Sequence, residues 1–188
     1  MKEALCVTVA AVLAAVSSLA QGQFTFANKN LNTTPPINAP ITCGGIGLAG
    51  SAYWAQAYIK LATDPDSSYA AVGAAVNFRT GAAAGYIVPV VVTTTYPNNT
   101  AVTVQMRVWD ASGGPSYEAA VASGKCYGLS IGVELKVAEA PTPPADMIGL
   151  QSFDGFCCIP EPSSLALAAL GATVLWSSRR RKACVGWA

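Results

Sequence analysis

Three segments of contrasting chemistry stand side by side near the C-terminal end of this sequence, and they constrain how the rest can be organised. Two prolines flank a glutamate at Pro160-Glu161-Pro162, so no helix can run through from upstream. The residues from Leu165 to Trp176 carry no charge, and the serines before them can cap a helix. Four consecutive cations then follow: Arg179, Arg180, Arg181 and Lys182. Because such clusters stay on the cytoplasmic side of a membrane, we expect a transmembrane helix over about 163–178 with its orientation set by these cations.

The order of these segments resembles the PEP-CTERM sorting signal of bacteria, which joins a Pro-Glu-Pro motif, a short transmembrane helix and an arginine-rich end. On this resemblance residues 159–188 are the signal, and its sorting motif is Pro160, Glu161 and Pro162. The resemblance implies a Gram-negative host, an exosortase partner, an inner-membrane-anchored intermediate, and delivery to the cell surface or an exopolysaccharide matrix. The alternative is an amphipathic or buried helix, because the uncharged run is shorter than the roughly 20 residues that span a bilayer.

The N-terminal residues 1–22 have the composition of a secretory signal peptide. A positive Lys2 precedes an apolar run, and small residues in Ser18-Leu19-Ala20 and Ala20-Gln21-Gly22 offer two cleavage sites. A buried N-terminal helix is the alternative. We therefore expect an exported domain over residues 23–158, flanked by a signal helix and a transmembrane helix.

The composition of that domain excludes several functions. The sequence contains no histidine, which removes the usual general base and metal ligand. Residues 23–158 hold six Lys and Arg against eight Asp and Glu, a net charge of −2 that gives no footprint for nucleic acid. We expect a protein that is not an enzyme and that needs no cofactor or metal. Membrane attachment through the C-terminal helix and polysaccharide binding are the partners that we consider.

Short alternating segments separated by turns predict a mainly β domain. In 52–61, Tyr53, Ala55, Ala57 and Ile59 share one face, and 100–110 alternates in the same way. Further strands are predicted at 24–27, 71–78, 85–96, 129–137 and 147–153, with one or two helical turns at 116–123. This spacing indicates an antiparallel β-sandwich, jelly-roll-like, with a closed barrel as the alternative.

Pieces of the domain, 51–56, 72–81 and 107–110, resemble exported PEP-CTERM proteins with an uncharacterised β-rich domain. The resemblance implies no particular activity. Four cysteines lie in the exported part, and we expect a Cys43–Cys126 disulfide, with buried thiols as the alternative.

Three aromatic residues are candidates for stacking on sugar rings: Trp54, Tyr58 and Trp109. By alternation they lie opposite the small aliphatic side chains, and exposed rings on a flat sheet suit a carbohydrate-binding module. Loops that cover this face are the alternative. A glycoside hydrolase is less favoured, because no spacing selects a pair among the acids Asp110, Glu118, Glu134, Glu139, Asp146 and Asp154. Asp64 and Asp66 fit a plain turn better than a calcium loop.

Overall fold

Two long antiparallel strands set the architecture of residues 21–155, the part of the chain that the computed structural model describes. Strand β6 (Gly50–Leu61) pairs with β9 (Ala101–Asp110) from Tyr53 opposite Asp110 to Leu61 opposite Val102. Side chains alternate between the two faces of this pair. The small aliphatic residues of both strands enter the main core, while Trp54, Tyr58 and Trp109 lie on the other face.

Three shorter strands extend this pair into a five-stranded sheet. Strand β7 (Ala70–Phe78) lines the free edge of β6, and β10 (Tyr127–Leu129) and β11 (Val133–Lys136) follow each other along β9. Ser130 lies between β10 and β11, and its hydrogen bonds to Met106 of β9 take the place of a regular strand pair there. Its backbone N–H donates to the Met106 carbonyl, and its hydroxyl accepts from the Met106 N–H at 2.9 Å. The edge of β9 therefore stays hydrogen-bonded across the break.

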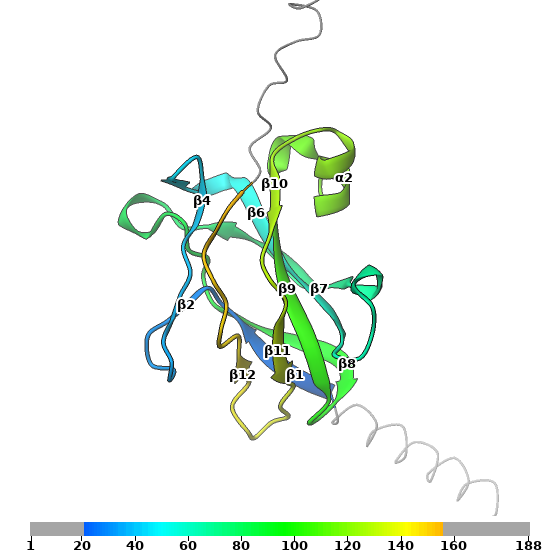
Figure 1. The fold of residues 1–188 in the computed structure, drawn as a ribbon. Helices are drawn as coiled ribbons and strands as arrows, with labels where there is room; N and C mark the ends of the chain where they lie inside the picture. The colour runs from blue at the N-terminus through cyan, green and yellow to red at the C-terminus, as the bar shows by residue number, and fades with distance from the viewer. Residues whose placement is uncertain (1–20, 156–188) are drawn as a thin grey trace, which may run out of the picture. The chain divides into compact units, whose positions relative to one another are not determined.

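The second layer consists of two small sheets and a short hairpin (Figure 1). These are β12 (Ala145–Asp146), β1 (Gln21–Phe26) and β8 (Val90–Pro97); β13 (Phe153–Asp154), β4 (Ile41–Cys43) and β5 (Ile46–Gly47); and the hairpin of β2 (Lys29–Asn30) with β3 (Ile37–Asn38). Phe24, Phe26 and Ile41 from this layer join Val104 and Met106 from the five-stranded sheet in one core, and all five are fully buried. That core holds the two layers together through the removal of apolar surface from water.

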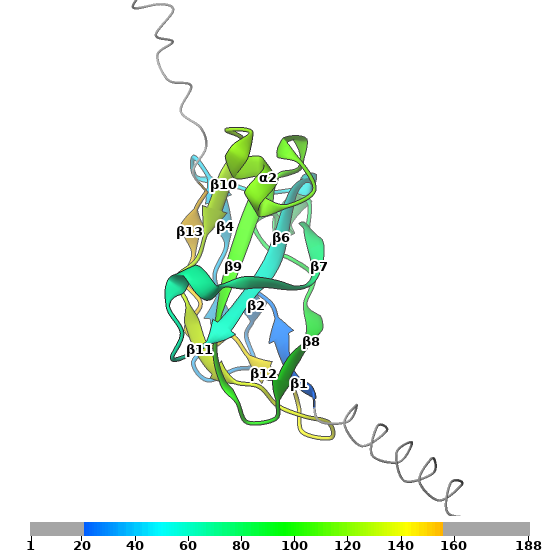
Figure 2. The same ribbon diagram turned by 90° about the vertical axis from the view of Figure 1, so that its right-hand side faces the viewer.

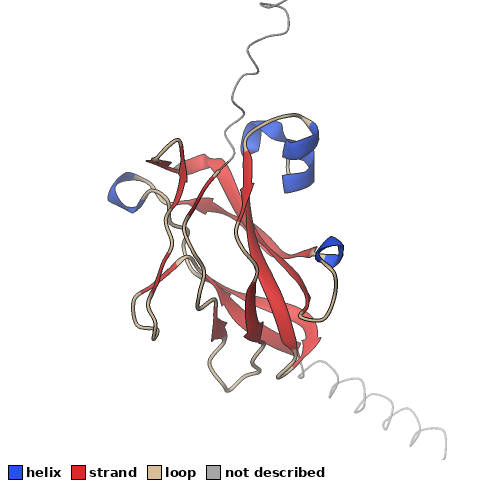
Figure 3. Ribbon diagram, in the orientation of Figure 1, coloured by secondary structure: helices blue, strands red, loops and turns tan. Residues whose placement is uncertain are grey.

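The described residues contain one α-helix, α2 (Tyr117–Ala122), together with three single turns of 3₁₀ helix: η1 (Asp66–Ser68), η2 (Gly81–Ala83) and η3 (Ala111–Gly113). Ser116 caps α2 by accepting a hydrogen bond from the Ala119 N–H. Figure 2 shows α2 in front of the outer face of the five-stranded sheet, near the end of β9, and Figure 3 shows how little helix the domain contains. This helix decides which part of the aromatic face stays open.

The mainly β class that the sequence predicts is confirmed, and so are the strands at 52–61, 71–78 and 100–110 and the short helix. The segment 85–96 forms a strand only from Val90, after Pro89, whose nitrogen cannot donate to a ladder. The predicted strand over 129–137 is divided at Ser130. The predicted strand over 147–153 was wrong, because β12 ends before it and only its last residue, Phe153, belongs to a strand, β13.

Two parallel pairs depart from the all-antiparallel order of a jelly roll. Strand β12 runs parallel to β1, and β13 runs parallel to β4. Both are segments of the last part of the domain that return to strands near its beginning.

None of the helices among residues 21–155 is long and apolar enough to cross a membrane. The predicted signal peptide and transmembrane helix lie outside the described residues.

Candidate functional site

The outer face of the five-stranded sheet gathers several aromatic side chains around one cation. Arg107 of β9 lies over the ring of Tyr58, with the guanidinium carbon 4.1 Å from the ring centroid, and is 5.0 Å from that of Tyr117 and 5.6 Å from that of Tyr69. Tyr117 also packs edge-on against Tyr58 and Tyr127. We call Arg107 with these four tyrosines the arginine–tyrosine cluster. A guanidinium over several rings is a stabilising arrangement, and here it binds α2 to the sheet.

The expectation that Tyr58 and Trp109 offer open rings for sugar stacking was wrong. Their side was predicted correctly, opposite the aliphatic residues, but Tyr58 is 2% exposed and Trp109 is 1% exposed. Tyr117 of α2 covers Tyr58, and the Trp109 ring N–H donates to the Gly114 carbonyl at 3.2 Å in the loop before α2. Ring faces closed in this way cannot stack on a ligand.

Trp54 keeps an open part of its ring beside this covered region. It lines a hollow of about 530 Å³ together with Ser51, Ala75, Trp109, Ala111, Gly114 and Pro115. Trp54 is half-buried, Pro115 and Ser51 are exposed, and no charged side chain contributes to the lining. We call this hollow the Trp54 groove. Its mixture of an indole, a proline and a serine suits a ligand with both apolar faces and hydroxyl groups.

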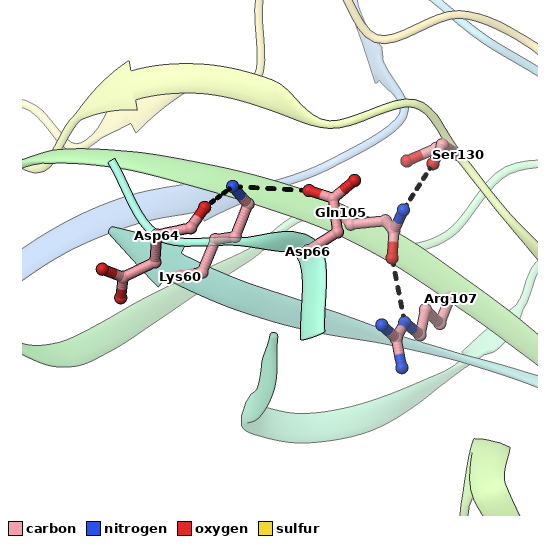
Figure 4. A network of polar contacts seen from close by, with 6 residues as sticks. All are labelled: Lys60, Asp64, Asp66, Gln105, Arg107 and Ser130. Atoms are coloured by element: carbon pink, nitrogen blue, oxygen red, sulfur yellow. Dashed lines mark hydrogen bonds and ion pairs between the residues drawn. The ribbon is translucent and has the colours of Figure 1, made fainter. Parts of the chain in front are cut away.

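A second hollow, of about 510 Å³, lies further along the same face and is polar. Lys60, Asp66, Gln105 and Glu134 line it with Tyr69, Thr103 and Ser130, and two exposed apolar residues, Leu129 and Ile131, form part of its wall. We call it the polar groove. Gln105 is held across it, because its amide donates to the Ser130 carbonyl at 2.9 Å while its oxygen accepts from Arg107 Nε at 2.9 Å (Figure 4).

The contacts of Lys60 bear on whether Asp64 and Asp66 form a plain turn or a calcium loop. The Lys60 ammonium donates to the Asp64 carbonyl and lies 3.4 Å from the Asp66 carboxylate (Figure 4). One of the two carboxylates, that of Asp66, is therefore paired with a cation of the chain itself. Within residues 21–155, no group of three or more His, Cys, Asp or Glu side chains is placed to hold a metal ion.

Glu118 is the acid most closely tied to the arginine–tyrosine cluster. Burial raises its pKa, but hydrogen bonds from its own N–H, from Tyr58 and from Ser116, together with the Arg107 charge, act against burial and bring the pKa below the usual 4.5. The Tyr58 hydroxyl donates to Glu118 at 3.0 Å, and burial followed by this bond raises the pKa of Tyr58. Glu118 is thus an ionised structural partner rather than a protonated general acid.

The other candidate acids are dispersed over the domain. Asp110 caps η3 by accepting from the Ser112 N–H, Asp146 accepts from Asn30, and Asp154 accepts from the Thr42 hydroxyl. Glu134 lines the polar groove, and Glu139 lies in the turn after β11. The hydrolase reading gains no support from these positions, since each of the three hydrogen-bonded acids serves a local structural contact.

The expected Cys43–Cys126 disulfide stays a prediction. Cys43 is disulfide-bonded, and it lines a small apolar cavity together with Cys126, Tyr53, Trp109 and Gly155. In the sheet, β13 runs beside β4, and the Gly155 N–H donates to the Thr42 carbonyl next to Cys43. Segment 153–155 is therefore the neighbour of Cys43 in the sheet.

Sequence reasoning missed Arg107 as the centre of the outer face and Lys60 as the partner of the aspartates. Alternation placed both on this face, but the residues that surround Arg107 come from β6, α2 and the η1 turn. The sequence did offer one signal for Arg107, which is a cation at an outward position of a central strand. A charge that becomes covered by other residues needs partners, so such a position indicates a cluster around it. The predicted sorting motif and the cations Arg179, Arg180, Arg181 and Lys182 lie outside the described residues.

Comparison with known families gives one match, to the PEP-CTERM protein-sorting motif over residues 159–182. The match covers the Pro-Glu-Pro motif, the uncharged run and the basic cluster. Comparisons with curated proteins and with solved structures found no match.

Proposed function

Because the chain carries the PEP-CTERM sorting motif and so belongs with the exosortase substrates, we propose that it is exported as a membrane-held precursor and then cut by an exosortase near Pro160-Glu161-Pro162. The match over residues 159–182 is the observation that carries this proposal. The uncharged run holds the precursor in the inner membrane, and Arg179 to Lys182 keep the C-terminal end on the cytoplasmic side. The released product is residues 21–155 with a short tail.

The intact mass of the protein from the envelope and the medium of its host tests this proposal. We expect a mass that lacks both the N-terminal signal and the residues beyond the Pro-Glu-Pro motif. A variant with Arg179, Arg180, Arg181 and Lys182 replaced by glutamate should not be processed, and a Lys125→Glu variant, altered at a cation of the domain, is the matched control. A mature protein that retains 165–188 would refute processing.

The first strand supports one of the two signal-peptide cleavage sites. Gln21 is paired with Pro97, and the carbonyl of the buried Gly22 accepts from the Thr94 hydroxyl at 3.0 Å. Cleavage after Gly22 would remove both residues from β1, whereas cleavage after Ala20 keeps the strand whole. We therefore place the mature N-terminus at Gln21, and N-terminal sequencing of the exported protein that begins at Gln23 would contradict this.

We propose that the domain itself is a non-catalytic component of the cell surface or of an exopolysaccharide matrix. The matching family is a sorting motif rather than a catalytic family, and the sequence supplies no histidine for acid–base chemistry. Loss of the protein should change the matrix or the surface, and a deletion strain complemented with the wild type is the comparison. An unchanged matrix composition and surface adhesion in that strain would count against the role.

The second candidate is carbohydrate binding in the Trp54 groove. Its support is the half-open indole in a hollow of about 530 Å³, large enough for a sugar unit to stack on the ring. Electrophoresis through gels with an embedded polysaccharide should retard the protein, and Trp54→Ala should abolish the retardation. Tyr86→Ala, at a partly exposed ring outside both grooves, is the matched control. Equal mobility of wild type and Trp54→Ala across acidic and neutral polysaccharides would refute binding at this groove.

A further inference from the structure

We propose that the polar groove is a binding site for a neutral saccharide, separate from the Trp54 groove. Its volume of about 510 Å³ lies within the range of small-molecule sites in proteins. Among the described residues, none lines both grooves. Thr103 of the polar groove and Trp109 of the Trp54 groove are about 20 Å apart along β9. A ligand in the polar groove therefore leaves Trp54 untouched, and the inference goes beyond the carbohydrate site considered above.

The main evidence for a ligand is a buried hydroxyl that the fold itself does not use. Thr103 is 7% exposed and lines the groove. Its hydroxyl forms no hydrogen bond with any residue of 21–155, whereas every fully covered polar side-chain atom in this part of the chain has a partner. The Thr103 hydroxyl is therefore uncovered on the side of the groove, where a ligand can both donate to it and accept from it.

Lys60 and Gln105 supply hydrogen-bond donors that are already held in place (Figure 4). The Lys60 ammonium has three N–H donors, of which a backbone carbonyl and the carboxylate of Asp66 take two. The Gln105 amide is fixed between the Ser130 carbonyl and the Arg107 side chain, which leaves its second N–H for a ligand. Both donor side chains are at least nine-tenths buried. Donors held in this way lose little conformational entropy when a ligand binds.

Two exposed carboxylates supply the acceptors. The Asp66 side chain is 91% exposed and contacts Lys60 through one oxygen, Oδ1, so its second oxygen is open to the groove. Glu134 lines the groove as an exposed residue and forms no ion pair within residues 21–155. A saccharide hydroxyl donates one hydrogen bond and accepts others, so a lining with both carboxylates and N–H donors matches it.

The charges of the groove select a neutral ligand. One positive charge, on Lys60, stands against two negative charges, on Asp66 and Glu134, so an acidic saccharide would meet net repulsion. An amine is disfavoured for another reason. The Tyr69 ring already has the Lys60 ammonium 5.4 Å and the Arg107 guanidinium carbon 5.6 Å from its centroid, and a further cation beside them would be repelled.

The remaining wall of the groove suits the carbon-bound face of a sugar ring. Leu129 and Ile131 are 40% and 54% exposed, so a ring that covers them removes apolar surface from water. At Gly132 between them and the sheet, a Cβ would come within 2.6 Å of both the Tyr69 hydroxyl and the Thr103 methyl group. Glycine at this position therefore allows these two side chains to meet beside the groove.

Ligand-observed NMR on the full chain tests the proposal. The protein is kept in a detergent without a sugar head group. The probes are cellohexaose, maltohexaose and mannohexaose, which are neutral, and hexagalacturonate, which is acidic. We expect saturation transfer from the protein to at least one neutral hexaose at about 10 mM, and no displacement of that hexaose by an equal concentration of hexagalacturonate.

Two conservative variants assign the site. Thr103→Val removes the hydroxyl, keeps the shape of the side chain and places a strong strand former in β9. Glu134→Gln removes a charge at an exposed position. Each should raise the Kd of the bound hexaose at least about threefold, which corresponds to the loss of one hydrogen bond. Thr95→Val, at an exposed threonine of β8 outside both grooves, is the matched control and should leave the Kd unchanged.

The results separate this site from the other proposals. Absence of transfer to all three neutral hexaoses, displacement by hexagalacturonate, or a Kd of Thr103→Val or Glu134→Gln equal to that of Thr95→Val would each overturn it. Binding that is lost in Trp54→Ala and kept in Thr103→Val would place the saccharide in the Trp54 groove and would also overturn it. Export does not enter this experiment, because the mass of the mature protein reports on export separately.

Discussion

Replacement of the buried Asn28 by alanine should destabilise the domain more than that of any exposed asparagine. Asn28 is fully buried in the turn after β1, and its side chain joins three separate segments. The amide nitrogen donates to the carbonyls of Ala39 and Gly85, each at 2.8 Å, and the amide oxygen accepts from the Ile87 N–H at 3.0 Å. In Asn28→Ala, three backbone groups lose these partners within the second layer, and the Gly85 carbonyl keeps one other partner, the Ile41 N–H at 3.0 Å.

The size of the effect follows from those three bonds. A typical intramolecular hydrogen bond contributes about 1 kcal/mol net, and a backbone group left buried without a partner costs about 1–3 kcal/mol. Some entry of water into the vacated space reduces the total, so we expect a loss of about 4 kcal/mol in the free energy of unfolding. Since about 1.4 kcal/mol corresponds to a factor of ten, amides that exchange only on global unfolding should exchange about 10³-fold faster.

Hydrogen exchange of the β9 amides, measured by mass spectrometry on the full chain in mild detergent, is the assay. Strand β9 is the central strand of its sheet, so its amides report global unfolding. Asn38→Ala is the matched control, because Asn38 is exposed and accepts a single bond from the Tyr86 hydroxyl. A change in Asn28→Ala no larger than that in the control would show that the three bonds do not hold the second layer together.

Two further perturbations test other parts of the structure. Trp109→Ala should cost about 3–5 kcal/mol in urea unfolding and Trp54→Ala clearly less, because only Trp109 is fully buried; equal costs would contradict the coverage of Trp109. Glu118→Gln should narrow the stability difference between pH 3 and pH 6. The folded pKa of Glu118 lies below 4.5, so the stability that its carboxylate contributes is present above that pH and is lost as the pH falls through the folded pKa. This contribution to the free energy of unfolding should stay below about 1 kcal/mol, since the side chain is 60% exposed. Identical pH profiles of stability for the wild type and Glu118→Gln would refute it.

The sequence was informative where a local pattern decides the structure. Alternation along 52–61 and 100–110 predicted both the strands and their core faces, because a strand exposes successive side chains on opposite sides. The same rule gave the correct side for Trp54, Tyr58 and Trp109. It did not predict that α2 covers part of that side. The coverage depends on how the segment 111–122 folds back over the sheet, and the hydrophobic pattern of this segment is too weak to predict that.

Pairing between distant segments was beyond local reasoning. Strand β13 has two residues, and its partner Ile41–Cys43 lies more than a hundred residues earlier in the chain. Nothing in Phe153-Asp154 identifies that partner, so the strand that lies beside Cys43 in the sheet could not be predicted. Asn28 gave no signal either, because its three backbone partners become neighbours only when the second layer is assembled.

Removal of the sorting motif should leave the domain folded. The main core joins β1, β4 and β8 to β6 and β9, and among residues 21–155 no buried polar side chain lacks a hydrogen-bond partner. The last strand among residues 21–155 ends at Asp154, so a cut near residues 160–162 removes no residue of these sheets. We therefore expect a chain that ends at Cys158 and the full chain to show β9 exchange rates equal within about threefold, since each tenfold corresponds to about 1.4 kcal/mol. Exchange a hundredfold faster in the shorter chain would mean that the signal also stabilises the fold, and cleavage would then be a conformational step as well as a release.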